Sequence, residues 1–145
     1  EAHFTHEASL LGSRLAADMQ PFGTQIAFAC NPPLALAQWC AGLPVQNLDR
    51  EVTSLAQARD HIAATRAQVA AIDADDSRLQ AIKRVGLGPE MYCELPGLRY
   101  VDDFVLPNLY FHVTTAYAIL RNAGAALGKA DFMTQLAGDV RKVDA

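Results

Sequence analysis

The sequence predicts a single, mainly α-helical domain, and three observations carry this prediction. Apolar residues recur at intervals of three and four along most of the 145-residue chain. Residues that start and stop helices, such as Ser54 and Gly124, flank these apolar stretches. Hydrophobic residues make up 51% of the chain, which is enough for one buried core at this length. We therefore expect one all-α domain over residues 1–145.

The first predicted helix covers residues 11–30. Its apolar residues share one helical face and are Leu11, Leu15, Met19, Phe22, Ile26 and Cys30. Pro21 is expected to kink or restart this helix, because proline has no amide hydrogen to donate. The Asn-Pro-Pro sequence at 31–33 is expected to end it, and the short helix that follows should end at Gly42.

Two further elements are predicted in the middle of the chain. Ser54 and Gln57 have the spacing of a capping box, in which each side chain binds the backbone amide of the other residue. The helix that they open should run to about Asp73. Between residues 80 and 94 the pattern changes to two short extended runs around a Gly-Pro turn, which predicts a small β-hairpin.

The last long helix is predicted in two stretches. Residues 98–105 have a helical pattern, and Pro107 marks a kink or a new start before the helix continues to Asn122. Gly124 stands where a glycine commonly ends a helix. The sequence from Gly124 to Lys129 lacks the spacing and the hydroxyl group of a phosphate-binding loop, so we interpret it as a helix end and a turn.

Charge, cysteine content and polarity exclude several kinds of partner. The net charge of -4 is spread along the chain without a basic block, so nucleic acid is not expected as a partner. The three cysteines are widely spaced and form neither a disulfide framework nor a zinc ribbon, which favours a reducing cytoplasm. The uncharged stretches at 21–48 and 104–120 contain prolines or polar residues, and we interpret them as buried helices instead of membrane spans.

His112 is the strongest candidate for a functional residue. It has apolar neighbours on the last long helix and lies one turn after Asn108. A buried neutral imidazole must use one nitrogen as a donor and the other as an acceptor, or bind a metal through one of them. A single histidine cannot form a catalytic zinc site, for which three protein ligands are usual. A hydrogen-bonded core histidine is therefore the favoured interpretation.

Two stretches of the sequence resemble a known family. "LPNLYFHVTTAYAILRNAGAALGKADF" and "SRLAADMQPFGTQIAFAC" are similar to an uncharacterised bacterial domain family within the DinB/YfiT-like metalloenzyme superfamily. The resemblance covers about residues 11–132. It implies a four-helix bundle whose first helix is absent or truncated in this sequence. A bundle without that helix would expose an apolar face, which favours a homodimer or some other cover.

The resemblance also implies where a metal would bind. Metal-bound members of the superfamily use one histidine from an early helix and an H-x-x-x-H pair from a later one. In this sequence those positions fall on Gln25, Asn108 and His112. Amide oxygens are poor ligands for zinc or nickel beside imidazole, so we expect an incomplete metal site with His112 as its only histidine.

Two hypotheses of function follow from these residues. The favoured one is a non-catalytic bundle that binds a partner or ligand and has no complete three-histidine metal site. The alternative is a metal- or histidine-dependent transferase or detoxifying enzyme, acting on a small molecule and resembling superfamily members with full histidine sets. Its candidate pocket contains His112, Asn108, Gln25, Asp18 and Tyr117.

Overall fold

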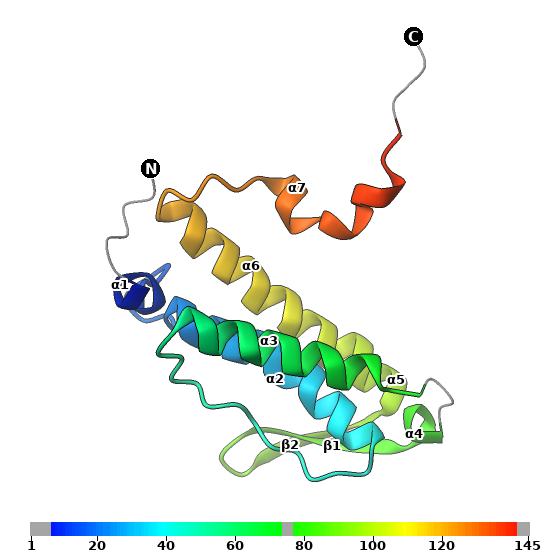
Figure 1. The fold of residues 1–145 in the computed structure, drawn as a ribbon. Helices are drawn as coiled ribbons and strands as arrows, with labels where there is room; N and C mark the ends of the chain where they lie inside the picture. The colour runs from blue at the N-terminus through cyan, green and yellow to red at the C-terminus, as the bar shows by residue number, and fades with distance from the viewer. Residues whose placement is uncertain (1–6, 74–76, 142–145) are drawn as a thin grey trace.

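The fold is built on three long helices that pack side by side (Figure 1). A computed structural model describes residues 7–73 and 77–141. The long helices are α2 (Phe22–Cys40), α3 (Leu55–Ala70) and α6 (Leu106–Asn122). The shorter elements are α1 (Glu7–Gly12), α4 (Ser77–Gln80), β1 (Ile82–Gly88), β2 (Met91–Pro96), α5 (Gly97–Tyr100), a π-helical turn (Val101–Val105), α7 (Lys129–Phe132) and a 3-10 helix (Thr134–Asp139). The predicted mainly helical fold with one small hairpin is confirmed.

Helix α2 is the centre of the bundle, because α3 and α6 both pack against it and hardly touch each other. The main core cluster lies where the three helices meet and includes Phe22, Ala27, Ala58 and Ile119. Burial of such side chains is the main stabilising contribution to a bundle of this size. Among the described residues, no helix is both long enough and apolar enough to cross a membrane.

The predicted helix over residues 11–30 was wrong before Pro21, whereas the restart expected at Pro21 is confirmed. Helix α1 ends at Gly12, residues 13–21 are not helical, and Pro21 is the N-cap of α2. Proline suits the start of a helix, where the amide hydrogen that it lacks has no helical partner. The Arg14 side chain donates a hydrogen bond to the Met19 carbonyl oxygen and so closes the irregular connection.

The predicted helix end at residues 31–33 was also wrong. Helix α2 continues through Pro32 and Pro33 to Cys40. Its packing against both α3 and α6 outweighs the local cost of the two prolines. The side-chain oxygen of Asn31 accepts a hydrogen bond from the Leu48 amide (2.8 Å) in the connection to α3. Gly42 follows the helix end with a φ of 72°.

The capped helix α3 is confirmed. The Ser54 hydroxyl accepts a hydrogen bond from the Gln57 amide (3.0 Å), as predicted. The return bond differs, because the Gln57 side-chain oxygen accepts from the Thr53 amide (2.8 Å) and not from the Ser54 amide. The helix ends at Ala70, a little before the predicted end near Asp73.

The predicted hairpin is confirmed as an antiparallel pair of strands in which Val85 lies opposite Cys93. It packs on a second core cluster that includes Tyr100 and Val105. Gly97 begins α5 against the backbone of α4. A Cβ atom at position 97 would lie 2.5 Å from the Cα atom of Leu79, so only glycine allows this approach.

The last long helix is continuous from Gly97 to Asn122, with a π-helical turn between α5 and α6. Pro107 lies in the first turn of α6, directly after this wider turn, where its missing amide hydrogen is tolerated. Gly124 adopts a φ of 88° after the helix, which confirms it as the residue that ends α6.

Candidate functional site

His112 and Gln25 form a direct contact between α6 and α2. The Nδ1 atom of His112 lies 2.7 Å from the Oε1 atom of Gln25. Because an amide oxygen is an acceptor, this contact places the imidazole hydrogen on Nδ1. The amide nitrogen of Gln25 donates to the Gln20 carbonyl oxygen at 3.1 Å. Gln25 is 2% exposed, so both of its polar atoms are bound inside the bundle.

Aromatic rings enclose the His112 imidazole. The ring centroid of Phe28 lies 5.4 Å away and that of Phe111 lies 5.1 Å away, both edge to face. The half-buried position lowers the pKa of His112 by desolvation, since removal from water disfavours the charged imidazolium. The structure therefore holds a neutral histidine with an assigned donor at Nδ1.

The other predicted site residues make different contacts. The Asn108 side chain donates to the Phe104 carbonyl oxygen of its own helix (2.7 Å), so it does not supply the second contact to His112. Asp18 is exposed in the connection between α1 and α2. Tyr117 lies on α6 and packs its ring against Phe132. Of the predicted set, the structure brings together only Gln25 and His112.

This arrangement does not fit a zinc or nickel centre. Within residues 7–73 and 77–141, no three His, Cys, Asp or Glu side chains lie close enough to share a metal ion. Gln25 offers its oxygen to the protonated Nδ1 atom, and the Asn108 amide is turned to the backbone. Tetrahedral zinc prefers imidazole and thiolate ligands, of which this cluster provides a single one.

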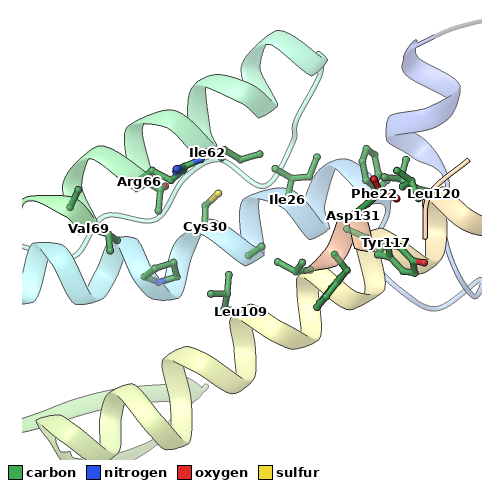
Figure 2. A pocket seen from close by; sticks show the side chains of 18 residues that line it. Phe22, Ile26, Cys30, Ile62, Arg66, Val69, Leu109, Tyr117, Leu120 and Asp131 are labelled. Carbon is green, nitrogen blue, oxygen red and sulfur yellow. The ribbon is translucent and has the colours of Figure 1, made fainter. Parts of the chain in front are cut away.

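A separate apolar groove lies between α3 and α6, with α2 as its floor (Figure 2). Its volume is about 730 Å³. Among the described side chains that line it, only those of Thr65, Arg66, Tyr117 and Asp131 contain oxygen or nitrogen. Such a surface excludes water readily and suits an apolar occupant. The resemblance implied an open apolar face, but the sequence did not identify the residues that border it.

Cys30 projects from the floor of this groove. Burial raises the pKa of its thiol, and the nearby polar side chain of Thr65 only partly opposes this shift. The thiol is therefore neutral near pH 7 and is a poor nucleophile, because the thiolate is the reactive form. The chemistry of the groove is that of apolar contact.

The helical bundle is that of a DinB-like protein, and within residues 7–73 and 77–141 no three His, Cys, Asp or Glu side chains could share a metal ion. The chain belongs to the family described as Domain of unknown function (DUF1993), whose model matches residues 1–133. It is also similar to the crystal structure of a DinB family member protein from Shewanella denitrificans. The two chains are 32% identical, with a TM-score of 0.72 over 87% of this chain and 72% of the other. No curated protein matches the chain.

The depressed pKa of His112 predicts a specific pH dependence of stability. The folded chain resists a proton that the unfolded chain accepts near the ordinary value of 6.5. The stability gained by keeping His112 neutral is fully present above the ordinary pKa of 6.5. It is lost as the pH falls through the lower pKa of the folded chain. Urea unfolding of wild type and His112→Gln near pH 7.5 and near pH 5 measures it. Wild type should lose more stability on acidification than the variant, and equal losses would contradict the assignment.

Proposed function

We propose that this chain is a non-catalytic binding protein that retains a DinB-like bundle without metal chemistry. The contact between His112 and Gln25 carries the proposal. At position 25, where the resemblance implies a metal-binding histidine, this chain has a glutamine. The side-chain oxygen of Gln25 accepts a hydrogen bond from the His112 imidazole. The pair joins α2 to α6 and satisfies polar atoms that would otherwise be buried without partners.

The apolar groove supports the binding role. Neither His112 nor Gln25 lines it, and its walls come mainly from α2, α3 and α6 with few polar side chains. Rigid helices that present a concave apolar surface are a common basis for binding a helix or a ligand. The enzymatic alternative places Asn108 and Asp18 in one pocket with His112, whereas the Asn108 amide binds its own helix and Asp18 is exposed in a connection.

A metal titration tests the proposal, both in wild type and in a variant that is designed to gain a zinc site. Untagged wild type should contain no stoichiometric zinc or nickel and should bind none in calorimetry. The variant with Gln25→His and Asn108→His restores three imidazoles around position 112 and should bind about one zinc ion per chain. Asn108→His alone is the matched control, because it leaves Gln25 in place, and it should not bind.

The opposite result is equally clear. Wild type that carries one metal ion per chain, lost on His112→Ala, would replace this proposal with the enzymatic alternative. Circular dichroism should show that each variant remains helical, so that a loss of metal binding is not caused by unfolding.

A further inference from the structure

The inner face of the hairpin carries a lysine at a position where an apolar residue is usual. Side chains two positions apart in a strand point to the same face, so Lys83 shares its face with the buried Val85. The neighbouring residues Ile82 and Arg84 are exposed, and the Arg84 guanidinium lies over the Tyr92 ring at 3.5 Å. Lys83 is only partly exposed, because its face packs on the second core cluster. The amine of Lys83 is therefore held at the edge of a core.

Two aromatic rings enclose the amine of Lys83. Its Nζ atom lies 5.5 Å from the ring centroid of Trp39 on α2 and 5.8 Å from that of Tyr100 on α5. The two rings meet edge to face at an interplanar angle of 84°. The hairpin lies beside the last turn of α2 (Figure 1). Because the face of an aromatic ring attracts a cation at such distances, the rings join the ammonium group of the hairpin to α2 and α5.

No carboxylate balances the Lys83 ammonium. In the part of the chain that the structure describes, the one ion pair joins Arg99 to Asp103 and does not include Lys83. Aromatic rings offer only partial charge, so they do not replace the hydration that burial removes. Burial therefore lowers the pKa of Lys83, since removal from water disfavours the charged amine. At a given pH, a larger fraction of this amine is neutral than for a lysine in water.

The environment of Lys83 favours acylation of its amine. The neutral amine is the nucleophilic form, and lysines desolvated beside apolar surfaces are activated in this way. Lys83 combines a larger neutral fraction with a fixed position and partial exposure. Acylation would also have a structural consequence. An amide carries no charge, so it loses the attraction between the ammonium group and the ring faces.

We propose that Lys83 is a site of acetylation by acetyl thioesters, and that acetylation releases the hairpin from the rings of Trp39 and Tyr100. The Nζ atom attacks the carbonyl carbon of the thioester and forms an amide bond. The bond between that carbon and sulfur breaks, and the departing thiolate takes up the proton that the amine loses. The acetyl group suits this position because it is small and uncharged beside an apolar cluster. The inference concerns residues outside the candidate site and does not rest on the proposed binding role.

Acetylation of the folded, full-length chain by S-acetyl-N-acetylcysteamine, a small acetyl thioester, tests the reactivity of Lys83. Peptide mass spectrometry at pH 8 should show Lys83 acetylated about threefold faster than Lys129, because a larger fraction of the Lys83 amine is neutral. Lys129 is the matched control, because it is exposed at the start of α7. The difference should disappear in urea, where both amines are in water. Equal rates in the folded chain would overturn the proposed site.

Trp39 reports the release of the hairpin, because it is the only tryptophan of the chain. Acrylamide should quench its fluorescence about twofold more strongly in Lys83→Gln, which resembles the neutral acetylated side chain, than in wild type. Lys83→Arg keeps the charge and should match wild type. Arg84→Gln is the matched control on the outer face of β1, since it removes the same charge and should leave the quenching unchanged.

Wild type acetylated at Lys83 gives a second measurement of release that needs no substitution, and it should show the same rise in quenching. Unchanged quenching in both the acetylated chain and Lys83→Gln would show that the charge does not hold the hairpin in place. An equal rise in Arg84→Gln would assign the effect to net charge instead of the ring contacts. None of these measurements involves a metal ion, so a failed metal test and a failed acetylation test can be told apart.

Discussion

Replacing Tyr100 with alanine is expected to destabilise the protein by about 3–5 kcal/mol, the usual range for a large aromatic residue in a core. Tyr100 is 2% exposed and stacks on Phe104 at 5.7 Å, with Trp39 edge to face at 5.8 Å. Burial raises the pKa of its hydroxyl to about 12, which agrees with a ring surrounded by low-dielectric material. Removing the ring would leave a cavity between α2, the hairpin and the π-helical turn.

Thermal unfolding measures this effect. A loss of that size corresponds to a fall in melting temperature of roughly 10 °C for a chain of this length. Tyr110→Ala is the matched control, because Tyr110 lies on α6 but is 59% exposed, and its loss should change stability by less than about 1 kcal/mol. Equal effects of the two substitutions would show that the cluster beneath the hairpin is not a core.

Local signals explain which helices the sequence could predict. The ends of α3 and α6 depend on Ser54, Gln57 and Gly124, whose hydrogen bonds or backbone angles involve residues within a few positions. Such contacts join residues only a few positions apart, so short sequence patterns predict them. The helix end expected at residues 31–33 was wrong for the opposite reason. There the outcome depends on packing of α2 against two distant helices, which overrides the local effect of proline.

The candidate site shows the same division. Gln25 and His112 are 87 positions apart, so no spacing in the sequence could bring them together. They were placed in one cluster only because the resemblance assigned both positions to a ligand set. The groove could not be predicted from the sequence for a different reason. Its lining residues follow the same helical periodicity as core residues, and only the relative placement of α3 and α6 decides which row is covered.

Replacing Gln25 with alanine is expected to cost about 3 kcal/mol, because it removes a buried side chain and leaves two polar groups without their partners. The Nδ1 hydrogen of His112 and the Gln20 carbonyl oxygen both bind this one amide. Gln38→Ala is the matched control on the same helix. The Gln38 amide binds the backbone of Gln46 at an exposed position, so its loss should cost less than about 1 kcal/mol.

A double-mutant cycle separates the contact from the burial of Gln25 alone. Urea unfolding of Gln25→Ala, His112→Ala and the double variant gives the coupling energy between the two side chains. A hydrogen-bonded pair inside the bundle should show a coupling of about 1–3 kcal/mol, so the double variant should lose less stability than the sum of the single variants. If the losses add without coupling, Gln25 stabilises α2 alone and His112 lacks the bound partner that the proposed metal-free role requires. If the coupling is present, the amide at position 25 stabilises the fold through its hydrogen bond with the His112 imidazole.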